Sequence, residues 1–337
     1  MKVLDQIIER AKATPKRIVL CEGDDPRIMD AAVRAAECGV ARITLVGDQV
    51  AINGAASDAG HSLANIDIVD PSESPLTTEL AHALFELRGA KGMTETQAEH
   101  ETYNPLTFAN LLVRTGHADG SVAGAVHTTS DVVRSAIQLL GVRPGMSMVS
   151  SFFLMVFCEP YHRIKGGLIF SDCGLVIEPD AEQLATIALA AADSGRALLN
   201  DIPRVAMLSF STHQSARHAT VDRVIDAARR VHATRPELAI DEDVQLDSAI
   251  VPEIAQRKLP DSRVGGKANV LVFPSLEAGN IGYKLAERMG GAKAIGPLLQ
   301  GLNKPANDLS RGCSAEDVYY VIAVTAVQAQ AASQDAP

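Results

Sequence analysis

Apolar and polar positions along the first part of the chain predict alternating strands and helices. Residues 17–23 form an apolar run typical of a buried strand, residues 26–38 show helical spacing that ends at Gly39, and residues 41–47 again favour a strand. The alternation continues with a strand at 66–70, a helix over 77–88, two helices across 94–116 and a strand at 121–125. Strands joined by helices predict a parallel, doubly wound sheet with helices on both faces.

The pattern changes in the middle of the chain, where two long apolar runs follow each other. Residues 148–157 and 167–172 are joined by a polar turn that carries Cys158 and His162, which predicts a hairpin and a second sheet. Further patterns follow, with a helix at 180–200, a strand at 204–210, a helix at 219–235 and a strand at 244–247. We therefore expect a second α/β unit.

The stretch 267–317 combines a strand, a Gly-rich turn and a helix. The apolar run 268–273 predicts a strand, and a helical pattern starts at Ile281 with Asn280 as its N-cap. A helix N-terminus offers unpaired backbone N–H groups and a positive dipole end, which suits a phosphate or a carboxylate. An ordinary connection between a strand and a helix explains these residues equally well.

The second half of this stretch, 296–317, favours neither helix nor strand until its last residues. Ser310 and Arg311 are predicted to lie in a turn. Ser314 is expected to cap a final helix that extends to about residue 330, with Asp317 in the capping-box position. A hydroxyl, a guanidinium and a carboxylate are thereby expected close together, although Asp317 alone is typical of a cap and Ser310 alone of a turn.

Another candidate site follows the strand at 121–125. A helix opens after His127, and its first residues bring three hydroxyls to the carboxyl end of that strand: Thr128, Thr129 and Ser130. Such residues also suit plain helix capping. Arg134, one turn into the same helix, favours an anion site. Arg88 ends an earlier helix, where the residues alone favour a cation that stabilises the helix end.

Length and composition limit the classes of protein that this chain can represent. The length of 337 residues predicts two domains. Hydrophobic residues make up 47% of the chain, but no apolar run reaches the ~18 residues that a membrane helix requires. The net charge of -10 argues against nucleic-acid partners but not against a small anion held by a few arginines. The amphipathic N-terminus is unlike a signal peptide, and the five cysteines are expected as reduced thiols in the cytoplasm.

Several blocks of sequence carry a resemblance that covers essentially the whole chain: KANVLVFPSLEAGNIGYKLAERMGG at 267–291, GPLLQGLNKPANDLSRGCS at 296–314, ADGSVAGAVHTTSDVVRSAIQ at 118–138, SSFFLM at 150–155 and RVAMLSFST at 204–212. They resemble the phosphate acetyltransferases of the phosphate acetyl/butyryltransferase family. The resemblance implies two doubly wound α/β domains with a cleft between them, an architecture similar to that of isocitrate and isopropylmalate dehydrogenases. It further implies a discontinuous first domain, 1–148 plus 297–337, and a second domain, 149–296.

The resemblance also implies the reaction acetyl-CoA + phosphate = CoA + acetyl phosphate, by direct attack of the CoA thiolate in a ternary complex. Asp317 would then be the base, Ser310 a donor to the oxyanion and Arg311 the phosphate ligand. Arg88 and Arg134 match family arginines assigned to substrate binding, and Cys158 matches a cysteine near the active site. We expect Asp317 to be desolvated, because its ordinary pKa of about 3.9 lies far below that of a thiol, about 8.5.

Coenzyme A is thus a substrate, and no cofactor is expected. The histidines at 162, 213 and 218 lack a metal-ligand spacing, so no metal site is expected either. The resemblance further implies a homodimer in acetate metabolism that is linked in function to acetate kinase.

One departure from the family pattern concerns Gln214, which stands where the family commonly has glycine, and it puts the conformation of the turn 211–216 in doubt.

Three alternatives to a phosphate acetyltransferase remain open. One is a phosphate butyryltransferase, one a non-catalytic module that senses CoA or acetyl phosphate, and one, more distant, an oxidoreductase. A role in propanediol or ethanolamine utilisation is also left open.

Overall fold

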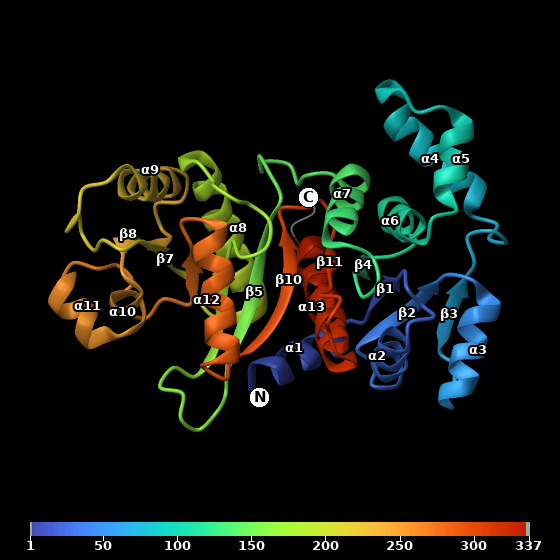
Figure 1. The fold of residues 1–337 in the computed structure, drawn as a ribbon, viewed down its shortest axis with the longest axis horizontal. Coiled ribbons are helices and arrows are strands. Elements are labelled where there is room, and N and C mark those ends of the chain that lie inside the picture. Colours follow the sequence, from blue (N-terminus) through green and yellow to red (C-terminus); the bar gives the residue numbers. More distant parts are fainter. Residues whose placement is uncertain (1, 335–337) are drawn as a thin grey trace. The chain divides into compact units, whose positions relative to one another are not determined.

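The structure is a computed structural model that describes residues 2–334. The chain divides into two compact units (Figure 1), which are described separately below. We call Leu4–Pro144 with Leu302–Pro337 the terminal unit, and Met1–Val3 with Gly145–Gly301 the inserted unit. The α/β class predicted from the sequence is confirmed in both.

The terminal unit is built on a five-stranded sheet in which every described strand pair is parallel, as predicted. The strand order is β11-β4-β1-β2-β3. The strands are β1 (Lys16–Leu20), β2 (Ala41–Val46), β3 (Ile66–Val69), β4 (Gly120–Ala123) and β11 (Ala306–Asp308). Because β1 lies between β2 and β4, the chain builds the sheet first to one side of β1 and then to the other.

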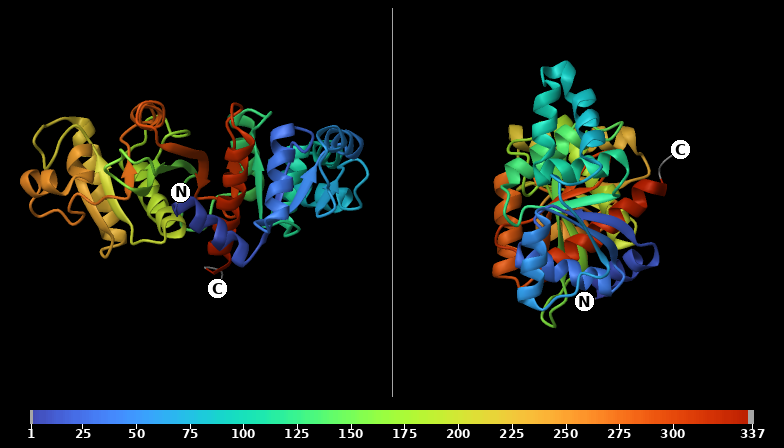
Figure 2. Two further views of the ribbon diagram at one scale, coloured as in Figure 1. Left: turned by 90° about the horizontal axis from the view of Figure 1, so that it is seen from below. Right: turned by 90° about the vertical axis from the view of Figure 1, so that its right-hand side faces the viewer.

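Helices alternate with these strands: α1 (Lys2–Ala13), α2 (Pro26–Glu37), α3 (Gln49–Ala59), α4 (Thr77–Arg88), α5 (Glu95–Thr102), α6 (Pro105–Thr115), α7 (Thr129–Leu140) and α13 (Ala315–Gln334), with a 3-10 turn at Gly89–Lys91. Helix α13 is apolar around its whole circumference, and residues 318–327 are all buried against α2, β1 and β4. Helices α4 and α5 pack on each other and project away from the sheet (Figures 1 and 2).

The inserted unit contains a six-stranded sheet of order β10-β5-β6-β9-β7-β8. Strands β5 (Ser150–Phe157) and β6 (Gly166–Ser171) form the predicted antiparallel hairpin, and β10 (Lys293–Gln300) pairs antiparallel with β5. The other strands are parallel to β6: β9 (Val270–Val272), β7 (Arg204–Leu208) and β8 (Ala239–Val244). Its helices are α8 (Ala181–Leu199), α9 (Ala219–Thr234), α10 (Leu246–Ile250), α11 (Pro252–Lys258) and α12 (Leu276–Arg288).

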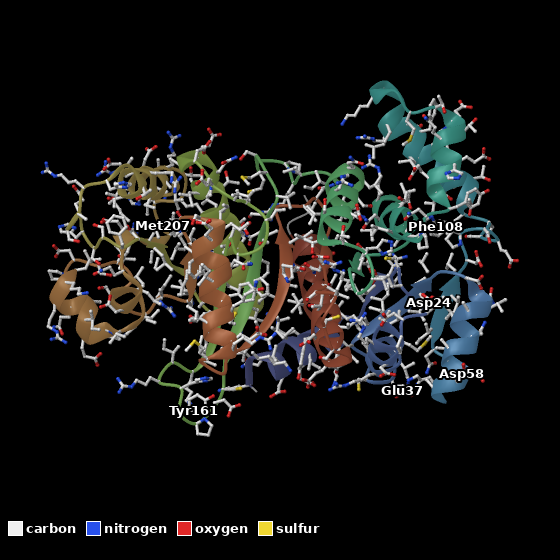
Figure 3. The ribbon with its side chains drawn as sticks, viewed as in Figure 1. Asp24, Glu37, Asp58, Phe108, Tyr161 and Met207 are labelled. Carbon is white, nitrogen blue, oxygen red and sulfur yellow. The ribbon has the colours of Figure 1, made fainter. Side chains whose placement is uncertain are left out.

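Each unit has its own apolar core. Phe108 on α6 is fully buried in the terminal unit, and Met207 on β7 is 1% exposed in the inserted unit (Figure 3). Tyr161, on the loop between β5 and β6, is 67% exposed. All five cysteines are free thiols in the structure. Within residues 2–334, every helix falls short of the length and hydropathy needed to cross a bilayer.

The predicted strand at 244–247 is wrong in position. The strand is β8, Ala239–Val244, and a short helix begins at Leu246. Asp241 and Asp243 give the strand segment a polar sequence, yet both side chains are buried. Hydrogen bonds compensate for this burial: Asp241 accepts from Ser262 Oγ at 2.6 Å and Asp243 from Ser211 Oγ at 2.7 Å.

The prediction that 296–317 lacks regular structure before its final helix is wrong, because β10 extends to Gln300 and β11 covers Ala306–Asp308. Gly296, with φ +150, and Pro297 stand at an irregularity in the pairing of β10 with β5. An edge strand tolerates proline there because one side of it needs no partner. Strand β11 has only three residues, too few for a recognisable alternation.

The predicted N-cap at Asn280 is also wrong. Helix α12 begins five residues earlier, and the hydroxyl of its N-cap Ser275 accepts from Ala278 N at 3.4 Å. Asn280 lies inside the helix and donates from Nδ2 to the carbonyl of Cys173 at 3.1 Å. Gly279 does not break the helix, because it lets the helix approach the backbone at Asp172: a Cβ at position 279 would lie 2.2 Å from the Asp172 oxygen.

Candidate active site

The predicted site residues of the terminal unit gather mainly at one edge of its sheet. Strands β11, β4 and β1 are neighbours and parallel, so their carboxyl ends meet at this edge. The strand order reverses between β1 and β4. In doubly wound sheets, ligands bind outside the carboxyl ends at such a reversal.

Glu22, just after β1, organises the loop that follows β4. Its carboxylate is 4% exposed and lies 2.8–3.2 Å from five nitrogens: the backbone N atoms of Gly124, Ala125, Val126 and His127, and His127 Nδ1. Burial raises the pKa of Glu22, but the hydrogen bonds from His127 and the loop outweigh burial and hold it below its ordinary value. Glu22 therefore fixes the backbone that leads into α7.

Arg27, near the start of α2, ties the same loop to the turn after β11. Its Nη1 donates to the Arg311 carbonyl at 2.7 Å, and its Nη2 donates to the Ala125 carbonyl at 2.9 Å. An ion pair with Asp25 at 2.8 Å fixes the guanidinium and raises the pKa of Arg27. Sequence reasoning selected neither Glu22 nor Arg27, because the loop and turn residues that they bind lie 98 to 286 residues away in the sequence.

The N-terminus of α7 lies where the sequence predicted it, with Thr128 as N-cap. Its three hydroxyls are all engaged: Thr128 with Asp131, Thr129 with Asp308, and Ser130 with Arg134. The backbone N–H groups of Thr129 and Ser130 have no acceptor within residues 2–334. These N–H groups, rather than the hydroxyls, are thus free to bind an anion.

Asp308 is the last residue of β11 and connects two of the candidate segments. Its Oδ2 accepts the Thr129 hydroxyl at 2.7 Å, while its Oδ1 is buried without a hydrogen-bond partner among the described residues. Burial, with a smaller contribution from the charge of Glu22, outweighs the lowering effects of the Thr129 hydroxyl and the Leu309 backbone and raises the pKa of Asp308 to about 7. The turn with Ser310 follows two residues later.

The turn after β11 has the predicted form. The carbonyl of Ser310 accepts from Cys313 N at 2.9 Å, and its hydroxyl accepts from Gly312 N at 3.2 Å. Ser310 and Arg311 are exposed. Within the described part of the chain, the Arg311 guanidinium makes no hydrogen bond or ion pair, so it is available to an anionic ligand.

Asp317 forms the predicted capping box with Ser314. Its Oδ2 accepts from Ser314 N at 2.9 Å and from Ser314 Oγ at 2.8 Å, and Asp317 N donates to Ser314 Oγ at 3.2 Å. The side chain is half-buried rather than fully desolvated. Both bonds to the carboxylate involve Oδ2, and Oδ1 accepts no hydrogen bond within residues 2–334.

The remaining candidates are more scattered. Arg134 is exposed and forms an ion pair with Asp131 at 3.1 Å. Arg88 is half-buried at the end of the projecting helix α4, and its side chain makes no hydrogen bond or ion pair with the residues that the structure describes. Asn280 and Cys158 belong to the inserted unit, where Cys158 is exposed directly after β5.

Cys21, Glu22 and His127 each place a ligand-type atom within 4.8 Å of the others. Three such residues resemble a metal-binding group, but both Glu22 oxygens already accept N–H groups. Burial also raises the pKa of the Cys21 thiol well above its ordinary value, which disfavours the thiolate that a metal requires. We interpret the cluster as a hydrogen-bond network.

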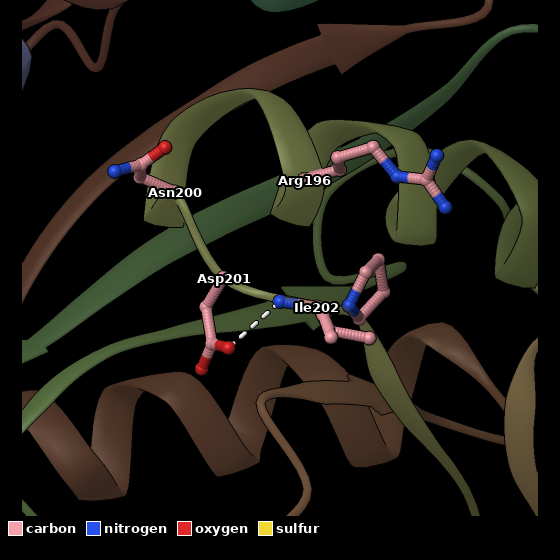
Figure 4. Close-up of a pocket in the computed structure, with 5 residues that line it drawn as sticks. Arg196, Asn200, Asp201 and Ile202 are labelled. Atoms are coloured by element: carbon pink, nitrogen blue, oxygen red, sulfur yellow. Dashed lines mark hydrogen bonds between the residues drawn. The ribbon is translucent and has the colours of Figure 1, made fainter.

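Two surface pockets lie away from this edge. One of about 200 Å³ is lined by Arg114, Leu140, Asn303 and Lys304 of the terminal unit. The other, of about 530 Å³, is lined by Arg196 and Asn200–Pro203 of the inserted unit (Figure 4). Both lie next to segments that lead into β11 or β7, hence at the amino ends of parallel strands, and no predicted site residue lines either.

Comparison with known proteins agrees with these observations. The profile of the family described as Phosphate acetyl/butaryl transferase matches residues 2–326. A phosphate acetyltransferase of Paracoccus denitrificans is 49% identical over 328 residues, which cover 97% of this chain and 99% of that protein.

Solved structures give the same picture. A phosphotransacetylase from Staphylococcus aureus has a TM-score of 0.90 and 41% identity, covering 97% of this chain and 98% of that one. One from Streptococcus pyogenes has a TM-score of 0.91 and 39% identity, covering 98% of each chain. A 4-hydroxythreonine-4-phosphate dehydrogenase from Burkholderia phymatum, 14% identical with a TM-score of 0.52, shares the fold alone over 95% of this chain and 97% of its own, in agreement with the predicted dehydrogenase-like architecture. The chain belongs to the Phosphate acetyl/butaryl transferase family, as its sequence blocks predicted.

Proposed function

We propose that this protein is a phosphate acetyltransferase, which catalyses acetyl-CoA + phosphate = CoA + acetyl phosphate. The observation that carries the proposal is the bond between Thr129 and Asp308, which holds the N-terminus of α7, with its free N–H groups, next to the turn of Ser310 and Arg311. Relatives that are 42–49% identical bear the acetyltransferase name, which favours acetyl over butyryl transfer.

The phosphoryl group is expected to bind at the N-terminus of α7. Free N–H groups of Thr129 and Ser130 and the dipole of this 12-residue helix favour an anion there. Arg311 adds a guanidinium that makes no bond within residues 2–334 and can hold two phosphate oxygens at once. We assign Arg88 and Arg134 to substrate binding as well; Arg134 would have to leave Asp131 in order to bind substrate directly.

The acyl transfer itself needs a base and an oxyanion donor. Asp317 takes the proton of the CoA thiol on Oδ1, and the thiolate attacks the carbonyl carbon of acetyl phosphate. The hydroxyl of Ser310 donates to the tetrahedral oxyanion. When the intermediate collapses, the bond between the carbonyl carbon and the phosphate oxygen breaks, and phosphate leaves with its electron pair. Coenzyme A is a substrate in this scheme, and no cofactor is required.

The two assignments in the inserted unit have different origins: Cys158 follows from the resemblance, and Asn280 from its predicted place at a helix N-terminus. Cys158 is proposed as a neighbour of the substrates rather than a nucleophile, because direct transfer needs no acyl-enzyme. Asn280 is proposed to contact substrate, although its amide is bonded to the Cys173 carbonyl. We also infer a homodimer whose acetyl phosphate is exchanged with acetate kinase.

The test is thioester formation from CoA and acetyl phosphate, with butyryl phosphate as comparison. Three variants separate the roles: Arg311→Ala, Asp317→Asn and Ser314→Ala. Ser314→Ala removes the capping bonds of its hydroxyl but keeps the carboxylate, so it should cost about 1 kcal/mol of stability with little loss of turnover. Asp317→Asn and Arg311→Ala should each lower kcat/KM by at least about 100-fold.

Arg42→Ala, an exposed arginine on β2, is the matched control and should retain wild-type rates. Preference for butyryl phosphate would keep the mechanism and change the substrate. A folded protein that binds CoA but forms no thioester from either donor would refute the enzyme assignment in favour of a sensing module. Equal losses in Ser314→Ala and Asp317→Asn would show that Asp317 acts only as a cap.

A further inference from the structure

Asp308 is a buried carboxyl group that the proposed reaction does not use. It is 0% exposed, and its strand pairs in parallel with β4, so that Asp308 stands beside Ala123. The next residue continues the pairing, because Leu309 N donates to the Ala123 carbonyl at 2.7 Å. The side chain is therefore fixed at the end of the sheet, directly below the turn that carries Ser310 and Arg311.

The two oxygens of Asp308 have different surroundings. Oδ2 accepts the hydroxyl of Thr129, the first residue of α7, at 2.7 Å. Oδ1 faces Gly124, where a Cβ would lie only 2.4 Å away, and it has no hydrogen-bond partner among residues 2–334. A buried oxygen without a partner is costly, above all when the carboxyl group is charged.

Several charged groups lie on the elements packed around Asp308: Glu22 after β1, His127 before α7, Asp131 and Arg134 on α7, Arg311 in the turn, and Glu316 and Asp317 on α13. Only Glu22 among them contributes to the raised pKa of Asp308, and its effect is smaller than that of burial. The pKa of about 7 means that Asp308 changes charge near neutral pH.

We propose that Asp308 is a positioning residue for the phosphoryl site, which holds the N-terminus of α7 through Thr129 and whose negative charge opposes anion binding there. This inference rests on the proposed function for its substrate, acetyl phosphate. The bound phosphoryl group would accept from the N–H group of Thr129, and the hydroxyl of the same residue donates to Asp308. A charge on Asp308 would therefore lie close to the bound phosphoryl group. At such a separation an unscreened pair of charges can change affinity by about tenfold or more.

The test compares the wild type with Asp308→Asn, which removes the charge but keeps an oxygen that can accept from Thr129. Affinity for inorganic phosphate is measured by titration calorimetry, and KM is measured for acetyl phosphate and for CoA, at pH 6 and pH 8. We use the ratio of wild type to variant at each pH, because the titration of phosphate itself cancels in it. The ratio of Kd, and that of KM for acetyl phosphate, should be near one at pH 6 and rise to about tenfold at pH 8. KM for CoA should stay unchanged.

Thr129→Val is the second variant, and it removes the bond while leaving the Asp308 carboxyl group. It should weaken phosphate binding at both pH values. A ratio that does not change with pH, or equal losses for acetyl phosphate and CoA at every pH, would overturn the proposal and leave Asp308 a structural residue. If neither donor yields thioester but the ratio for phosphate binding still rises with pH, the positioning role stands and the proposed function fails.

Discussion

Gln214 adopts a backbone conformation that amino acids with a side chain rarely take. Its φ is +59, and that of His213 is +50. The sequence raised doubt about this turn because the family commonly has glycine at position 214, and the turn keeps the left-handed conformation that glycine favours. Asp243 holds it in place: Oδ2 accepts from Gln214 N at 2.8 Å, and the carbonyl accepts from His213 N at 3.1 Å.

We therefore predict that Gln214→Gly stabilises the protein by about 0.5–1 kcal/mol. Glycine removes the strain of the left-handed backbone conformation, and this gain exceeds the loss that comes from the greater conformational entropy of glycine in the unfolded chain. Chemical denaturation measures the difference. Gln256→Gly, at an exposed position of helix α11, is the matched control and should destabilise by about 1 kcal/mol. Loss of stability in Gln214→Gly would mean that the side chain makes a compensating contact.

Asp308 also leads to a prediction about stability. Its pKa is raised from an ordinary 3.8 to about 7, so the folded protein binds this proton more tightly than the unfolded chain does. The protonated Asp308 therefore contributes to the free energy of unfolding, and this contribution is fully present below pH ~3.8. It is lost as pH rises to about 7, at roughly 1.36 kcal/mol per pH unit, or about 4 kcal/mol in all. Asp308→Asn lacks this loss.

The variant should thus gain stability relative to the wild type between pH 4 and pH 7, with no further gain above that range. Denaturation at several pH values tests this. Glu22 has the opposite sign, because its lowered pKa stabilises the fold above its ordinary pKa and that stabilisation is lost in acid. A difference between variant and wild type that is constant with pH would show that Asp308 does not titrate near neutrality.

The sequence identified the segments of the site better than its supporting residues. Ser310, Arg311, Asp317 and the start of α7 occupy the predicted turn, cap and helix, because local spacing decides turns and caps. Their roles in the reaction stay predictions. Glu22, Arg27 and Asp308 were not found, since each acts through partners more than 100 residues away in the sequence. Local pattern carries no information about such pairs.

At the scale of elements, the strongest patterns were predicted well and the weakest were missed. The helix at 77–88 has its predicted bounds, and the hairpin of β5 and β6 is confirmed. Helix α3 was not predicted, because only Ile52 and Ala56 of its 11 residues are buried and the apolar stripe is narrow. The acidic strand β8 and the early start of α12 depend on tertiary contacts that spacing does not reveal.

Helix α12 gives a prediction of its own, because Gly279 lets it lie against the backbone of Asp172. A Cβ there would lie 2.2 Å from the Asp172 oxygen and 3.0 Å from Cys173 Sγ. Gly279→Ala should move the helix and cost about 2–3 kcal/mol. Gly54→Ala is the control: position 54 lies in α3 with nothing within 4 Å of its Cβ, so alanine should stabilise by about 0.5–1 kcal/mol. Thermal denaturation compares the two; equal effects would refute close packing at Gly279.

At the scale of the whole molecule, α12 also suggests where a second copy would bind. Ile281, Leu285 and Met289 recur every four residues along this helix and its end, and they are 59%, 50% and 82% exposed. An exposed apolar stripe of this kind is typical of an interface. We predict a dimer of twice the 35.6 kDa chain by light scattering, and a monomer for Leu285→Glu. Gln256→Glu, at an exposed position of helix α11, is the control; a monomeric wild type would exclude the homodimer.

The length of the chain predicted more than one domain, and the resemblance rather than the local pattern predicted where the chain passes between them. These passages are close together in the terminal unit: Val142 pairs with Leu302, and Asn303 N donates to the Gly141 carbonyl at 3.0 Å. The local sequence around Val142 and Leu302 does not show that these residues, 160 positions apart, pair with each other. The inserted unit therefore leaves from and returns to one place, as an insertion in a surface loop would.

This arrangement has a consequence for the order in which the protein matures on the ribosome. Strand β11, helix α13 and the turn with Ser310 and Arg311 follow the inserted unit in the chain, within residues 302–337. The inserted unit ends at Gly301 and can fold while the terminal unit still lacks an edge strand and the helix whose residues 318–327 are all buried. The nascent chain thus waits for residues 302–337 before it can complete the proposed phosphoryl site, and a chain that ended before residue 302 would keep the start of α7 but lack Asp308 and Arg311.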